Sequence, residues 1–100
     1  MEKFKIKIFP SAQKDLLEIV DYINTLSPQA AIRYYDLIVE KIESIAKIPE
    51  RCPLAKDVQL KLRGYRTLYV ENYVVFYVVK GAVVEIRRIL YARRQYVDLL

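Results

Sequence analysis

The sequence contains no histidine, no tryptophan and a single cysteine, Cys52, among its 100 residues. A lone thiol cannot close an internal disulfide, which fits a reducing cytoplasm. The same shortage argues against a Cys–His nucleophile pair and against a zinc site. Only two glycines occur, and neither a glycine-rich phosphate loop nor a Walker motif is present. The sequence therefore predicts a protein that uses no metal and no cofactor.

Long apolar runs are missing as well. No stretch approaches the roughly 20 residues that a membrane helix needs, and the opening MEKFKIKIFP lacks the hydrophobic core of an export signal. We therefore expect a cytoplasmic protein that does not bind membranes. A chain with 54% hydrophobic and 29% charged residues is typical of a folded protein, and its length predicts one domain over residues 1–100.

Positive charge is in excess, since 17 Lys and Arg against 12 Asp and Glu give a net charge of +5. The excess is either a general solubility charge or an attraction for an anionic partner such as nucleic acid, the ribosome or an acidic protein segment. The distribution favours the second interpretation. Four arginines and two tyrosines gather near the C-terminal end: Arg87, Arg88, Arg93, Arg94, Tyr91 and Tyr96.

Arginine side chains bind phosphate or carboxylate through paired hydrogen bonds, and tyrosine rings stack on bases. We interpret Arg87, Arg93 and Arg94 as candidate anion-binding residues. Arg88 is interpreted as part of a structural salt bridge. Arg63 precedes the predicted sheet and fits an ordinary sheet residue and a site residue equally well.

The N-terminal half has the pattern of a strand followed by two helices. Alternating lysine and apolar residues predict a short strand over residues 3–8, with one lysine-rich face. Ser11 is the expected N-cap of a helix that runs to about residue 26. Ser27-Pro28 predicts the start of a second helix that continues to about residue 48. Because each helix has one apolar stripe, we expect an antiparallel hairpin.

The C-terminal half has the pattern of three strands. β-Branched and aromatic residues dominate Tyr65–Val70, Tyr73–Val79 and Val83–Tyr91. Tight turns at Glu71-Asn72 and Lys80-Gly81 join these strands into an antiparallel meander. The predicted fold class is therefore α+β, with an N-terminal strand, a helix hairpin and a three-stranded antiparallel meander.

The turn positions determine which side chains share a face of the sheet. One face is nearly all apolar and is expected to lie under the helices: Leu68, Val70, Tyr73, Val75, Tyr77, Val79, Ala82, Val84, Ile86 and Leu90. The other face is expected to stay open: Arg63, Tyr65, Thr67, Tyr69, Val74, Phe76, Val78, Val83, Glu85, Arg87, Ile89 and Tyr91. Arg88 is placed on the helix side. A bulge near Arg87-Arg88 would exchange the faces locally.

The order of these elements resembles the RelE/ParE superfamily, the toxins of type II toxin–antitoxin modules. The resemblance is carried in sequence order by FPSAQKDLLEIVDYI, SPQAAIRYYDLIVEKI, RGYRTLYVENYVVFYVV and VVEIRRILYARRQYVDLL, which cover nearly the whole chain. It implies a toxin that arrests bacterial growth. It also implies a cognate antitoxin whose C-terminal segment wraps the toxin, giving a toxin–antitoxin hetero-oligomer.

Two activities occur in that superfamily. RelE-like members resemble ribosome-dependent nucleases, in which an mRNA 2′-hydroxyl attacks the adjacent phosphate, whereas ParE-like members inhibit DNA gyrase. For a nuclease, the resemblance implies that Arg93 and Tyr96 are the catalytic residues. Whichever activity applies, Arg63, Arg87 and Arg94 are the residues that we predict to bind the anionic target.

One position favours the gyrase inhibitor. Nuclease members often carry an arginine in the third strand, and the matching residue here is Val74, which cannot bind phosphate or stabilise charge. We therefore predict a ParE-like gyrase inhibitor, with an mRNA endonuclease as the alternative. A non-toxic basic module that binds nucleic acid is the third hypothesis.

Overall fold

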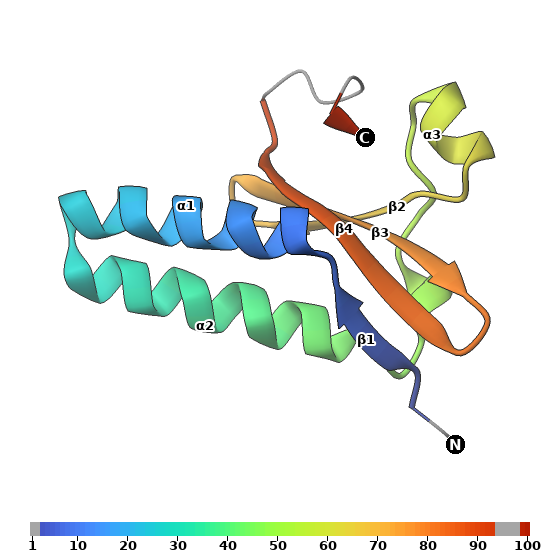
Figure 1. Ribbon diagram of the computed structural model, residues 1–100, viewed down its shortest axis with the longest axis horizontal. Coiled ribbons are helices and arrows are strands. Elements are labelled where there is room, and N and C mark those ends of the chain that lie inside the picture. The colour runs from blue at the N-terminus through green and yellow to red at the C-terminus, as the bar shows by residue number, and fades with distance from the viewer. Residues whose placement is uncertain (1–2, 94–98) are drawn as a thin grey trace.

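The computed structural model describes residues 3–93 and 99–100. A four-stranded sheet of order β1-β4-β3-β2 carries a helix hairpin on one face (Figure 1). In chain order the elements are β1 (Lys5–Ile8), α1 (Pro10–Leu26), α2 (Pro28–Ser44), the 3-10 helix η1 (Pro49–Arg51), α3 (Val58–Leu62), β2 (Arg66–Val70), β3 (Tyr73–Lys80) and β4 (Val83–Tyr91). The predicted α+β class is confirmed. The sheet is mixed, because β1 pairs with β4 in parallel.

The two long helices begin in different ways. Pro10 lies in the first turn of α1, and the preceding Phe9 is the N-cap residue without any side-chain hydrogen bond. Ser11 therefore lies inside the helix, and its predicted role as N-cap is wrong, because a proline with fixed φ and no N–H suits the first turn. Ser27 caps α2 as predicted: its Oγ accepts a hydrogen bond from the Ala30 N–H at 3.2 Å.

The short helix α3 was not predicted. Asp57 caps its start by accepting a hydrogen bond from the Leu60 N–H at 3.1 Å. Gly64, with φ of +81°, ends it: the Gly64 N–H donates to the Lys61 oxygen, and the Tyr65 N–H donates to the Leu60 oxygen. This pair of bonds is the Schellman arrangement, in which glycine adopts left-handed backbone geometry without steric cost. Gly64 thus ends α3.

The antiparallel meander is confirmed, and the pairing of β3 with β4 differs from the predicted register in two places. The β2–β3 register is the predicted one, with Leu68 opposite Val75. The β3–β4 turn lies at Gly81-Ala82, one residue later than predicted, because Lys80 pairs with Val83. Further along, Tyr77 pairs with Ile86 but Phe76 pairs with Arg88. Arg87 is therefore the extra residue of a bulge in β4.

The bulge exchanges the predicted faces of the last four residues of β4. Ile89 pairs with Val75 and joins the core under the helices, whereas Leu90 pairs with Val74 on the other face. The register likewise places Arg88 opposite Phe76 and Tyr91 opposite Tyr73. The predicted faces of all four residues are wrong for one reason, since a single added residue reverses the alternation that follows it.

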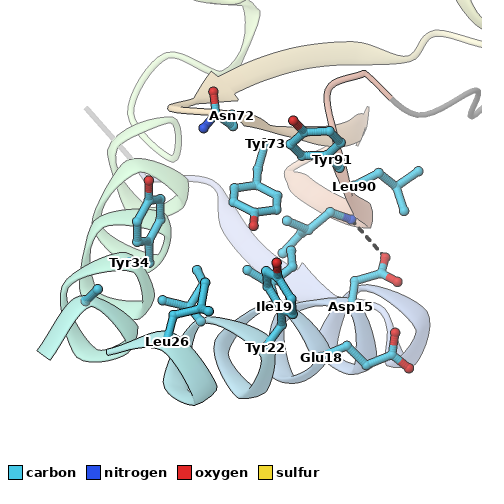
Figure 2. Close-up of a pocket in the computed structure, with 13 residues that line it drawn as sticks. Asp15, Glu18, Ile19, Tyr22, Leu26, Tyr34, Asn72, Tyr73, Leu90 and Tyr91 are labelled. Atoms are coloured by element: carbon cyan, nitrogen blue, oxygen red, sulfur yellow. Dashed lines mark hydrogen bonds between the residues drawn. The ribbon is translucent and has the colours of Figure 1, made fainter. Parts of the chain in front are cut away.

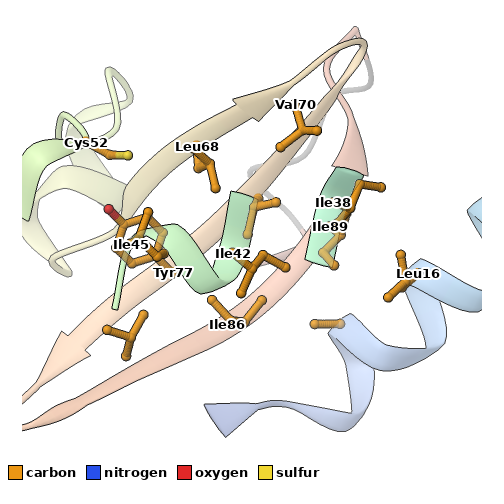
Figure 3. Packing of buried hydrophobic residues seen from close by; sticks show 13 residues of the cluster. Leu16, Ile38, Ile42, Ile45, Cys52, Leu68, Val70, Tyr77, Ile86 and Ile89 are labelled. Carbon is orange, nitrogen blue, oxygen red and sulfur yellow. The ribbon is translucent and has the colours of Figure 1, made fainter. Parts of the chain in front are cut away.

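The main core lies between the helix hairpin and the sheet (Figure 3). Ile38 and Ile45 enter it from the second helix and its C-cap, and Val75 and Ile86 enter it from the sheet; all four are fully buried. The Tyr77 hydroxyl is also buried and donates a hydrogen bond to the Pro49 oxygen. The first residue of η1 is thereby attached to the core.

The opposite face of the sheet is less open than predicted. Val74, Phe76, Val78 and Leu90 are buried there, in a second apolar cluster. The residues that cover them are Ala55, Leu60, Tyr65, Leu99 and Leu100. None of the helices within the described residues has the length and apolar character needed to cross a membrane.

Candidate functional site

Arg87, the bulged residue of β4, lies at the centre of a cluster on the face opposite the helix hairpin. Its guanidinium carbon is 4.6 Å from the centre of the Phe9 ring and 5.8 Å from that of Tyr65. Arg87 Nε and Nη2 donate to Glu85 Oε1 at 3.1 and 2.9 Å, and Nη1 donates to the Tyr65 hydroxyl at 3.3 Å. The guanidinium is therefore fixed in place, and Glu85 offsets part of its charge.

Arg63 brings a second cation to the same ring. It is the C-cap residue of α3, and its guanidinium carbon lies 5.2 Å from the centre of the Tyr65 ring. Its Nη2 also donates to the main-chain oxygen of Leu100 at 2.8 Å. Two of the predicted anion-binding arginines, Arg63 and Arg87, therefore share one aromatic neighbour.

Two exposed lysines of β1 extend this cluster. Lys7 pairs with Glu85 and Lys5 with Val83, so their side chains leave the sheet on the same side as Glu85. Lys7 Nζ lies 5.4 Å from the centre of the Phe9 ring. We name the following set the basic surface: Lys5, Lys7, Phe9, Arg63, Tyr65 and Arg87.

The chemistry of the basic surface suits binding. Guanidinium groups can pair with phosphate or carboxylate. The partly exposed Phe9 ring can add apolar contact, whereas the Tyr65 ring is 2% exposed and serves to position the two arginines. The neighbouring carboxylate, Glu85, is already in a salt bridge with Arg87 at 2.9 Å. Phe9 and Tyr65 were not predicted as arginine partners. Their pairing depends on the β4 bulge and on the path of α3, which no local sequence pattern specifies.

The other predicted site residues lie beyond β4. Arg93 is exposed and follows the end of that strand by two residues. Arg94 and Tyr96 lie outside the described residues. The structure thus brings Arg63 and Arg87 together and places Arg93 in the segment that leaves the sheet.

Arg88 has the structural role predicted for it. Its Nε and Nη2 donate to the two carboxylate oxygens of Asp15 at 2.7 and 2.9 Å, and Asp15 Oδ2 also accepts from the Ile89 N–H at 2.9 Å. The hydrogen bond to Asp15 raises the pKa of Arg88 above its ordinary value. Because β1 pairs with β4 only as far as Ile86, Asp15 satisfies the edge of β4 that β1 leaves uncovered.

A groove of about 670 Å³ lies between the helix hairpin and the strands β3 and β4 (Figure 2). Four tyrosines line it: Tyr22, Tyr34, Tyr73 and Tyr91. The Tyr73 ring meets those of Tyr34 and Tyr91 edge to face, with centres 6.1 and 5.9 Å away. Burial, together with the nearby tyrosines, raises the pKa of the Tyr73 hydroxyl. We name this site the tyrosine groove.

Metal-binding side chains do not gather within residues 3–93 and 99–100, where no three acidic, cysteine or histidine residues are grouped suitably for a metal ion. Cys52 is free and buried. The basic surface consists of charged and aromatic side chains, and the tyrosine groove adds aliphatic ones such as Leu26.

The sequence matches the family model for the ParE toxin of the type II toxin–antitoxin system parDE over residues 6–96. Among solved structures, the chromosomal ParDE system from P. aeruginosa is similar, with 24% identity, a TM-score of 0.78, and coverage of 91% of this chain and 98% of that chain. The RelBE2 toxin–antitoxin complex from Mycobacterium tuberculosis is similar at 18% identity and a TM-score of 0.63, with coverage of 91% of this chain and 93% of that chain. The protein HP0894 from Helicobacter pylori is similar at 13% identity and a TM-score of 0.53, with coverage of 88% of this chain and 93% of that chain. No curated protein matched the sequence.

Proposed function

Because the chain belongs to the ParE toxin family of type II toxin–antitoxin systems, we propose that it arrests bacterial growth by binding and inhibiting DNA gyrase. In this proposal the protein cuts no nucleic acid. Its arginines contact the target and carry out no bond-breaking step.

The observation that carries this proposal is the position of Val74. Its side chain is 1% exposed and packs in the second apolar cluster with Leu60 and Phe76. A nuclease of the related kind often has an arginine at this strand position, where it can stabilise the charge that develops on a phosphate. Here the position offers neither a cation nor access to a substrate, which supports an inhibitor that acts by binding.

The target-binding residues that we propose are Arg63 and Arg87, on the basic surface, together with Arg94, which lies outside the described residues. Arg87 is held by Glu85 and two aromatic rings, so its position is fixed before a partner arrives. Preorganised arginines lose little conformational entropy on binding. Arg93, exposed at the end of β4, is a further contact for an anionic target.

We also propose a cognate antitoxin that neutralises the chain within a hetero-oligomer in the cytoplasm. A net charge of +5 favours an antitoxin segment that is acidic. Charge complementarity mainly accelerates association, so the association rate constant should fall steeply as salt is added. Co-expression of the neighbouring reading frame should restore the growth of cells that express this chain.

Two assays on one preparation of the protein test the proposed target. In the first, purified chain is added to a DNA gyrase supercoiling reaction, and inhibition is expected. In the second, it is added to ribosomes programmed with mRNA, and the transcript should remain intact. Arg63→Gln should weaken the inhibition of gyrase, whereas Arg33→Gln, which changes an exposed arginine of α2, should not.

The alternative activity gives the opposite result. If the chain is an mRNA endonuclease, codon-phased cuts appear, Arg93→Ala abolishes them, and gyrase is unaffected. Loss of one preorganised charge-stabilising group costs on the order of a hundredfold in rate. Normal growth of several hosts that express the folded chain would leave the third hypothesis, a non-toxic module that binds nucleic acid.

A further inference from the structure

We propose that the tyrosine groove binds an arginine side chain that a segment of a partner protein presents among apolar residues. The proposal depends on the aromatic and acidic lining of the groove. It uses none of the residues of the basic surface, so it does not depend on whether gyrase is the target.

The first argument is local charge. The chain has a net charge of +5, yet no lysine or arginine of the described residues lines the groove, whereas Asp15 and Glu18 do. Asp15 is already bound by Arg88, at 2.7 Å. Glu18 is exposed and forms no salt bridge with the residues that the structure describes. The groove therefore offers one carboxylate to an incoming cation.

The second argument is the arrangement of the rings. Tyr73 projects from β3 into the groove, and Tyr22 faces it from α1 (Figure 2). Tyr22 is 63% exposed and Tyr91 is 43% exposed, so both rings are accessible from solvent. The face of an aromatic ring attracts a guanidinium within about 6 Å of its centre. One ring that lines the groove, that of Tyr34, already makes such a contact: the guanidinium carbon of Arg33 lies 4.7 Å from its centre.

The third argument identifies a peptide segment and not a free amino acid as the occupant. Glu18, Tyr22 and Leu26 recur at every fourth position of α1, so they form one row of about 12 Å along the groove. Leu26 is 70% exposed at the far end of this row. A row that begins with a carboxylate and ends with an apolar side chain fits a partner segment that carries arginine at one end and an apolar residue at the other.

The groove and the basic surface therefore have opposite preferences. The net positive charge of the chain attracts acidic partners over long distances, and the groove then selects a basic residue at close range. Like charges within one interface are costly, so a partner with arginine at the wrong position would be rejected.

The experiment uses the full chain and two blocked peptides rich in leucine and alanine, identical except that one has an arginine near one end and the other a citrulline at the same position. Citrulline keeps the shape of arginine and removes its charge. Binding is followed through the aromatic NMR signals of the nine tyrosines. We expect the signals of Tyr22, Tyr73 and Tyr91 to shift with the arginine peptide, with roughly tenfold weaker binding of the citrulline peptide.

Matched variants locate the site. Tyr22→Leu should weaken binding of the arginine peptide by about fivefold, and Glu18→Gln by about threefold. Tyr69→Leu and Glu40→Gln are the controls, because both side chains are exposed and lie outside the groove. Urea midpoints verify that each variant is folded. Equal affinity for the two peptides, an unchanged affinity of Tyr22→Leu, or shifts confined to Tyr65 and Tyr69 would overturn the proposal.

Discussion

Asp15 of α1 and Arg88 of β4, 73 positions apart, form a salt bridge with two hydrogen bonds of 2.7 and 2.9 Å. Their side chains are 9% and 21% exposed, so this pair is more buried than the Arg87–Glu85 and Arg33–Glu71 pairs. Arg88 Nη1 also donates to the Leu99 oxygen at 3.1 Å. One guanidinium thus joins the first helix to the C-terminal end of the chain.

Asp15→Asn should lower the free energy of unfolding by about 3 kcal/mol, because it leaves the Arg88 guanidinium without its carboxylate. The Ile89 N–H also loses its charged acceptor. The shift is measured by urea denaturation followed by circular dichroism. Asp21→Asn changes an exposed carboxylate of the same helix and should leave the midpoint almost unchanged. A loss smaller than about 1 kcal/mol for Asp15→Asn would show that the pair adds little stability.

Two serine substitutions should differ in effect. Ser27→Ala removes the hydroxyl that accepts from the Ala30 N–H and should cost about 1 kcal/mol. Ser11→Ala should cost almost nothing, because α1 begins at Pro10 without a side-chain cap. Urea midpoints compare the two variants directly. If Ser11→Ala were the more destabilising of the two, the start of α1 would be misplaced.

These two serines show how far the sequence predicts the fold. Ser27-Pro28 is a local signal for the start of a helix, because the cap and the proline both act within one turn. The start of α2 was therefore predicted correctly. At Ser11 two local signals competed, and the proline preference for the first turn prevailed over the serine cap. The predicted faces of the end of β4 were wrong for a different reason. The bulge at Arg87 depends on how β4 pairs with β3, which no local sequence pattern specifies. The tyrosine groove could not be predicted either, because its rings come from both helices, β3 and β4.

The stability of the chain should fall at alkaline pH through Tyr77. Burial is the largest cause that raises the pKa of its hydroxyl far above the ordinary value of 10.0. The unfolded chain therefore loses this proton first as pH rises past about 10, so the free energy of unfolding decreases with pH there. The stabilising contribution of the protonated Tyr77 hydroxyl is fully present below about pH 10. Tyr73, whose pKa is also raised, adds to the same trend.

Tyr77→Phe separates the two contributions of this hydroxyl. At neutral pH the variant should lose about 1 to 2 kcal/mol, because the Pro49 oxygen loses its donor. Between about pH 9 and about pH 11 its stability should fall less steeply than that of the natural protein. Tyr69→Phe, at an exposed position of β2, is the control. Parallel pH profiles for Tyr77→Phe and the natural chain would contradict this assignment.

Val74→Arg tests whether this strand position can hold the arginine of the alternative activity. The substitution buries a charge at a site that is 1% exposed, and it should cost more than about 4 kcal/mol, a large part of the stability of a domain of this size. Tyr69→Arg is the matched control: Tyr69 pairs with Val74 across β2 and β3 but is 59% exposed. Thermal unfolding compares the two. A folded Val74→Arg variant with an unchanged midpoint would mean that the second apolar cluster opens readily.

The parallel pairing of β1 with β4 has a consequence for how the protein is made. Lys5 pairs with Val83, and Phe9 donates to the Ile86 oxygen, so the first strand stays without its partner until the last strand has been translated. Contacts between such distant positions form late, because the chain entropy of closing the long intervening loop opposes them. The nascent chain cannot present the finished basic surface, which needs Lys5, Lys7 and Arg87 side by side, until β4 has emerged from the ribosome.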